Sequence, residues 1–109
     1  MNVVLIVVDA LCRDGLSVYD DSNSTPRLAE IASRSLVLDD VTAASCWTMP
    51  THASMFTGLY PSRHRAIEPR VRLDDSVPFV SEMLSESGFR THAINIPHPL
   101  SWDSGFDRG

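Results

Sequence analysis

The sequence contains no lysine, and all nine of its basic residues are arginine. Fourteen acidic residues give a net charge of −5, which disfavours binding to nucleic acid or to an anionic membrane surface. Acidic surfaces without lysine are typical of proteins that stay hydrated in concentrated salt, so a halophilic source is one hypothesis. A GC-rich genome that favours arginine codons explains the same composition, and both explanations stay open.

Cysteine and long apolar segments are also scarce. Two cysteines, Cys12 and Cys46, do not make a disulfide-stapled secreted scaffold, although one disulfide between them remains an alternative. We expect two buried or half-buried thiols in a cytoplasmic protein. The apolar run at residues 3–8 is too short to span a membrane, and it lacks the basic start of a signal peptide.

Hydrophobic residues make up 43% of the 109 residues, enough for one small core. Residues 3–8 are all apolar and mostly β-branched, with no alternation of apolar and polar positions. This pattern predicts a strand that is covered on both faces. Further strands are predicted at 36–42 and 89–96. Helices are predicted at 26–35, after Thr25 as cap; at 50–57, ended by Gly58; and between Ser76 and Gly88.

This order of elements predicts an α/β fold with a mostly parallel sheet and helices on both faces. Three strands are too few to complete such a sheet. We therefore interpret residues 1–109 as the N-terminal part of one larger domain, truncated in this chain.

Asp9 directly follows the first predicted strand. In open α/β sheets ligands bind beyond the carboxyl ends of the strands, and a carboxylate there suits a hard or borderline cation. Asp is also a common turn or cap residue after a strand, so both interpretations stay open.

The segment CWTMPTHASMFTG, residues 46–58, holds three candidate nucleophiles: Cys46, Thr48 and Thr51. Pro50 suits the first turn of a helix and places Thr48 near its N-terminus, where backbone N–H groups favour an anion. A hydroxyl there can attack phosphorus or sulfur. The alternative is that Thr48 only caps the helix.

Residues 47–64 look like the nucleophile motif of sulfatase-like hydrolases in the alkaline phosphatase superfamily. Residues 2–14 resemble the opening strand and metal loop of that family, and 25–28 and 105–109 resemble later segments in the same order. The resemblance implies that Thr48 is the nucleophile, forming a covalent threonyl ester that water cleaves. It implies that Asp9 is a ligand of a divalent ion, with Zn²⁺, Mn²⁺, Mg²⁺ and Ca²⁺ all open.

The chain departs from the sulfatase pattern at several positions. Sulfatases carry a Cys or Ser that becomes formylglycine where this chain has Thr48, which cannot be converted, and Cys46 lies two positions too early. His52 replaces the motif arginine and resembles the arrangement in nucleotide pyrophosphatase/phosphodiesterase relatives. His98 stands near the histidine of a further motif. We assign His52 and His98 to substrate binding.

The resemblance thus implies a metal-dependent hydrolase of phosphate or sulfate esters, with the departures favouring phosphate. The alternatives are a phosphoryl-group transferase of the same superfamily and an inactive truncated fragment. The substrate would be a small-molecule, glycan or nucleotide ester, with neither nucleic acid nor membrane as partner. Because the family's other metal ligands lie downstream, residues 1–109 alone are expected neither to bind metal tightly nor to hydrolyse esters.

Overall fold

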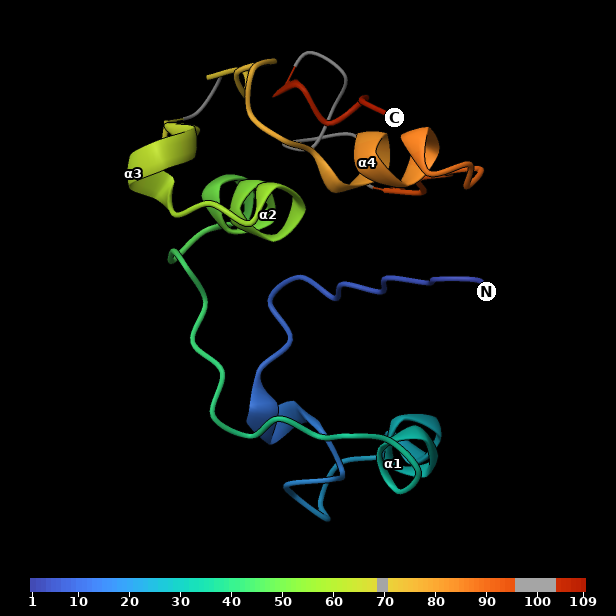
Figure 1. Ribbon diagram of the computed structural model, residues 1–109. Coiled ribbons are helices and arrows are strands. Elements are labelled where there is room, and N and C mark those ends of the chain that lie inside the picture. The colour runs from blue at the N-terminus through green and yellow to red at the C-terminus, as the bar shows by residue number, and fades with distance from the viewer. Residues whose placement is uncertain (69–70, 96–103) are drawn as a thin grey trace. The chain divides into compact units, whose positions relative to one another are not determined.

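The computed structural model describes residues 1–68, 71–95 and 104–109 (Figure 1). The chain divides into two compact units, Met1–Val41 and Thr42–Gly109. The first unit holds a short 3-10 helix, η1, and the helix α1. The described residues of the second unit form three helices. The bounds are η1 Arg13–Gly15, α1 Pro26–Ala32, α2 Thr48–Thr57, α3 Pro61–His64 and α4 Val80–Glu86.

The predicted α/β fold is wrong, because none of the described residues forms a strand or a sheet. In the run 3–8, predicted as a buried strand, every side chain is exposed, from 41% at Val7 to 79% at Val4 and Ile6. β-Branched residues favour extended backbone, but a strand exists only where its N–H and C=O groups pair with another strand. The described parts of 36–42 and 89–96 do not supply that pairing, and Ile96 lies outside the described residues.

In the first unit, α1 begins as predicted, with Thr25 at the N-cap and Pro26 as its first residue. It ends at Ala32, three residues before the predicted end at position 35. The Thr25 hydroxyl accepts a hydrogen bond of 2.8 Å from the Ser17 N–H and lies 2.9 Å from the Ser17 hydroxyl. Thr25 therefore ties the start of α1 to the loop after η1.

In the second unit, α2 begins two residues before the predicted start, at Thr48, and ends as predicted at Gly58. Gly58 has a φ of +69°, the left-handed conformation that glycine adopts without steric cost. The single-turn helix α3 follows α2 and lies beside it in Figure 1. The sequence does not predict a helix at these residues.

The helix α4 begins later than predicted. Ser76 is not its N-cap, because the Ser76 N–H instead bonds the Asp74 carboxylate at 2.8 Å, forming a turn before the helix. The end agrees with prediction: Gly88 has a φ of +85° and donates its N–H to the Ser85 carbonyl at 2.9 Å. This is the geometry of a glycine that terminates a helix.

The core of the second unit is built around three phenylalanine rings. Phe56 of α2 stacks on Phe79 with ring centroids 5.2 Å apart, and Phe106 meets both rings edge-on at 5.9 and 5.8 Å. Such arrangements bring the positive edge of one ring to the negative face of another. The buried hydrophobic residues of this core are Met49, Ala53, Ala66, Leu73 and Phe79 itself.

Arg108 fastens the C-terminal segment to α4. Its side chain is only 9% exposed, and its Nε and an Nη lie 2.8 and 2.6 Å from the two carboxylate oxygens of Glu82. The same guanidinium donates to the carbonyls of Asp75 and Val77, each at 2.9 Å, and lies over the Phe79 ring. Two nitrogens of the planar guanidinium bond the two carboxylate oxygens of Glu82, a paired contact that the single nitrogen of a lysine cannot make.

Two further findings concern the cysteines and the length of the helices. Cys12 and Cys46 are free and exposed, so the prediction of buried or half-buried thiols is wrong. Both lie in loops that precede a helix, where little packs against a side chain. Within the described part of the chain, no helix has both the length and the apolar character that crossing a bilayer requires.

Candidate functional site

The candidate site is the N-terminus of α2, where Thr48 is the first helical residue. The N-cap position belongs to Trp47, so the alternative that Thr48 serves as the cap is not what the structure shows. Thr48 is half-buried, and the first turn of the helix, all of it described, contains no acidic side chain. The positive end of the helix dipole is therefore not neutralised by a carboxylate of its own turn.

The local sequence explains why a helix starts here. Met49 and Ala53 lie four residues apart on one face and are buried in the core. Pro50 occupies the third helical position, where its missing N–H takes nothing from the helix. The Thr51 hydroxyl donates to the Ser45 carbonyl at 3.1 Å and holds the preceding loop against the first turn.

His52 folds back onto the start of the helix. Its side chain is buried at 8% exposure, and its Nδ1 lies 2.8 Å from the Thr48 carbonyl oxygen. Since a carbonyl only accepts, Nδ1 carries the hydrogen, and in the neutral ring Nε2 then holds a lone pair. The structure thus joins two of the predicted site residues, Thr48 and His52, through the backbone of the first.

A second buried histidine anchors the other side of α2. His64 of α3 is 2% exposed, and its Nδ1 accepts the Ala66 N–H at 3.1 Å. Its Nε2 therefore carries the hydrogen and donates to the Ser54 hydroxyl at 3.0 Å. Burial lowers the pKa of His64 from its ordinary value, with backbone hydrogen bonds opposing the shift. The imidazole is accordingly a neutral link between α2 and α3.

The roles of the other two predicted site residues, Asp9 and His98, stay predictions. Asp9 belongs to the unit Met1–Val41 and Thr48 to the unit Thr42–Gly109, so their pairing stays a prediction. The Asp9 carboxylate is exposed and accepts the Ala10 N–H at 3.1 Å. His98 lies outside the described residues.

Comparison with known proteins assigns the residues of this site to a family. The family model described as Sulfatase matches residues 1–108, nearly the whole of the chain. The chain belongs to the sulfatase family.

Two curated relatives in the sulfatase family come from Bacteroides thetaiotaomicron. A Delta 4,5-hexuronate-2-O-sulfatase is 25% identical over 111 residues, covering 96% of this chain and 23% of the relative. An N-acetylgalactosamine-6-O-sulfatase is 27% identical over 103 residues, covering 89% of this chain and 20% of the relative. The chain thus spans less than a quarter of the length of either relative. No solved structure gives a significant match.

Sulfatase-family proteins generally use a divalent metal ion. Within residues 1–68, 71–95 and 104–109, no three His, Cys, Asp or Glu side chains come together as a metal site. Asp9 brings one carboxylate, whereas a protein site for such an ion needs several ligands. The described residues therefore do not by themselves fit a metal centre.

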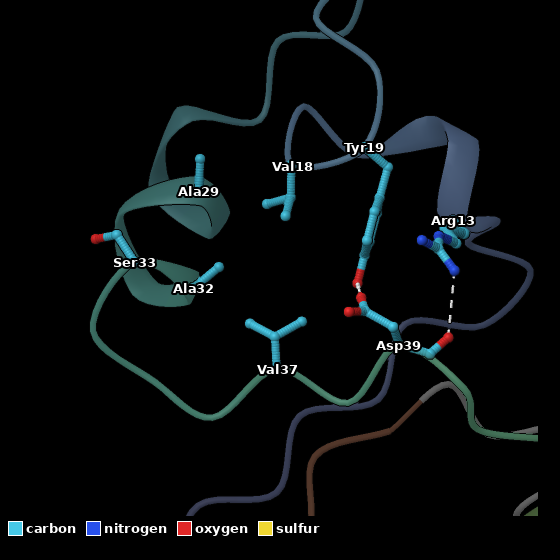
Figure 2. A pocket seen from close by; sticks show the side chains of 8 residues that line it. All are labelled: Arg13, Val18, Tyr19, Ala29, Ala32, Ser33, Val37 and Asp39. Atoms are coloured by element: carbon cyan, nitrogen blue, oxygen red, sulfur yellow. Dashed lines mark hydrogen bonds between the residues drawn. The ribbon is translucent and has the colours of Figure 1, made fainter.

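The first unit of this sulfatase-family chain contains a shallow hollow, shown in Figure 2. The Tyr19 hydroxyl donates to the Asp39 carboxylate at 2.7 Å, which raises the pKa of Tyr19. The Arg13 guanidinium stacks 4.1 Å from the Tyr19 ring and bonds the Asp39 carbonyl. The apolar wall comes from Val18, Ala29, Ala32 and Val37. None of the predicted site residues lines this hollow.

Sequence reasoning missed two residues that shape α2 and its surroundings. Nothing in the local sequence of His64 signals that its ring bonds Ser54, ten positions earlier. Arg108 likewise finds Glu82 across 26 positions. Both partnerships depend on tertiary contacts, which local periodicity does not report.

Proposed function

We propose that the full-length protein hydrolyses sulfate or phosphate esters, with Thr48 as the nucleophile. The observation that carries the proposal is the position of Thr48 as the first residue of α2, in the slot where the family motif has its nucleophile. The sulfatase names of both relatives support the class of ester. The N-terminus of a helix favours the negative charge that such a group brings.

The chemistry takes two balanced steps. In the first, the Thr48 oxygen forms a bond to sulfur or phosphorus while the bond to the ester oxygen breaks, and the Thr48 proton ends on the departing alcohol. In the second, water attacks the threonyl ester, which returns the Thr48 hydroxyl and releases inorganic sulfate or phosphate, or a phosphate monoester where the substrate is a diester. Charge that develops on the transferred group faces the start of α2, where helix N–H groups stabilise it.

Two observations favour different esters. The names of the two sulfatase relatives favour sulfate esters of sugars. Thr48 favours phosphate esters, because threonine cannot become formylglycine and its ester must be cleaved by a second attack at the central atom. We propose sugar sulfates and phosphate mono- and diesters as the substrate classes to compare.

The test compares full-length wild-type protein with Thr48→Ala on these ester classes, each with Zn²⁺, Mn²⁺, Mg²⁺ or Ca²⁺. Loss of a nucleophile is expected to lower kcat by about 10³-fold or more. Thr51→Ala is the matched control, since the Thr51 hydroxyl lies three residues along the same helix and donates to the Ser45 carbonyl. Full activity of Thr48→Ala would end the proposal. An added acceptor alcohol separates hydrolysis from group transfer.

Asp9 is the proposed ligand of the divalent ion. Asp9→Asn in the full-length protein is expected to raise the metal concentration needed for half-maximal activity, because an amide oxygen binds a cation more weakly than a carboxylate. Asp14→Asn is the control, an exposed aspartate of the nearby helix η1. An unchanged metal requirement in Asp9→Asn would contradict the assignment.

A further inference from the structure

The bond between His52 and Thr48 defines a specific chemical state for the imidazole. The ring is buried, and its Nδ1 hydrogen is directed to the Thr48 carbonyl at 2.8 Å. In that state the neutral ring has one donor, already used, and one lone pair on Nε2. His52 therefore acts on Thr48 through the backbone of the residue that carries the proposed nucleophile.

We infer that His52 is a positioning residue for Thr48: it holds the first turn of α2 by donating its Nδ1 hydrogen to the Thr48 carbonyl. This inference rests on the proposed function and goes beyond it, since substrate binding was the role predicted for His52 from sequence. The residue acts through Thr48 and does not itself need to touch the ester.

The surroundings of the first turn show why such a hold matters. The N-cap residue Trp47 makes no side-chain capping bond in the described structure, and Pro50 has no N–H to contribute. Two side-chain bonds reach from the first two turns to backbone carbonyls: His52 to Thr48, and Thr51 to Ser45. Helix ends fray where they are not capped. The His52 bond therefore restrains Thr48, the residue that carries the proposed nucleophile.

The shape of the side chain distinguishes this arrangement from the sulfatase pattern. The motif arginine that His52 replaces is a planar group with five N–H donors, whereas the imidazole turns its Nδ1 hydrogen to the Thr48 carbonyl and has only one other ring nitrogen.

The test separates the two ring nitrogens by substitution in the full-length protein. Asn places an amide donor near the position of Nδ1, whereas Gln places its amide near Nε2. We expect His52→Ala and His52→Gln to lower kcat by about 10- to 100-fold with KM within about twofold, because misplacement by about 1 Å costs rate of this order. His52→Asn is expected to keep kcat within about threefold of wild type.

Several outcomes would overturn the inference. Activity in His52→Gln with loss in His52→Asn would assign the role to Nε2, a substrate or metal contact. A raised KM with unchanged kcat would indicate substrate binding. Wild-type activity in all three variants would leave no role for the bond. Thermal unfolding of each variant excludes loss of the fold as the cause, and His52→Asn provides the rescue that a general packing defect does not give.

A spectroscopic measurement distinguishes failure of this inference from failure of the proposed function. In full-length protein labelled with ¹⁵N-histidine, we expect His52 protonated at Nδ1 and His64 protonated at Nε2 at neutral pH, with signals assigned by the loss of each in His52→Asn and His64→Asn. The opposite tautomer at His52 would overturn the inference even in an active enzyme. An active Thr48→Ala protein would overturn the nucleophile and leave this tautomer unaffected.

Discussion

Ser54 and His64 join α2 to α3 through a hydrogen bond of 3.0 Å between the serine hydroxyl and the imidazole Nε2. The Ala66 N–H donates to Nδ1, so a second ring proton on Nδ1 would displace that bond, whereas Nε2 would still donate to Ser54. Only the neutral ring therefore makes both bonds.

The first prediction concerns pH. Because the folded state lowers the pKa of His64 below its ordinary value, the unfolded chain binds the proton more readily. The free energy of unfolding should be constant above about pH 6.5, the ordinary histidine pKa, and should fall as the pH drops below it. Urea unfolding between pH 5.5 and 7.5 measures this slope.

The matched variants for that experiment are His64→Gln and His92→Gln. His92 is exposed, so its replacement should leave the pH dependence unchanged. His64→Gln should lower stability at neutral pH and flatten the slope. An equal slope in wild type and His64→Gln would show that His64 does not titrate between the folded and unfolded states as described.

A second prediction concerns the ion pair between Arg108 and Glu82, which holds the C-terminal segment to α4. Arg108→Lys keeps the charge but loses the paired contact to Glu82 and the bonds to the carbonyls of residues 75 and 77. We expect a loss of about 2 kcal/mol in the free energy of unfolding. Glu82→Gln should cost less, because the carbonyl bonds of Arg108 remain. Equal stability of Arg108→Lys and wild type would contradict the role of the planar group.

The third prediction compares two glycines with the same backbone conformation. Gly88 and Gly105 have φ values of +85° and +83°, but a Cβ on Gly88 would meet nothing within 4 Å. On Gly105 it would lie 3.0 Å from the Leu73 carbonyl oxygen. Gly88→Ala should cost about 1 kcal/mol from the left-handed conformation alone. Gly105→Ala should cost more, and equal losses by chemical denaturation would argue against the close contact.

The fourth prediction is that residues 1–109 alone do not bind a divalent ion tightly. The described residues bring no three ligand side chains together, and one carboxylate binds such ions weakly. Calorimetric titration with Zn²⁺, Mn²⁺, Mg²⁺ and Ca²⁺ should show no binding at micromolar concentrations, with the full-length protein as the positive control. Tight binding by the short chain would refute the prediction.

Local signals predicted the start of α1 and the ends of α2 and α4. Thr25 and Pro26 open α1, and Gly58 and Gly88 end their helices, because caps and left-handed glycines act over a few residues. The start of α4 was wrong because the Asp74 carboxylate captures the N–H of Ser76 and forms a turn instead.

The strands were wrong for a different reason. Residues 3–8 have the composition of a buried strand, but composition cannot supply the partner whose N–H and C=O groups complete a ladder. The same limit applies to the site. The motif placed Thr48 near the N-terminus of a helix predicted to start at Pro50, and the structure starts α2 at Thr48 itself. The hydrogen bonds of His52 and His64 depend on ring orientation, which sequence does not give.

The central claim is that Thr48 carries the covalent intermediate. The most direct measurement is rapid quenching of full-length protein during turnover of the best substrate, followed by peptide mass spectrometry. The account predicts a sulfuryl or phosphoryl group on Thr48 that is absent in Thr48→Ala and present in Thr51→Ala. The group on any other residue, or turnover by Thr48→Ala, would contradict it.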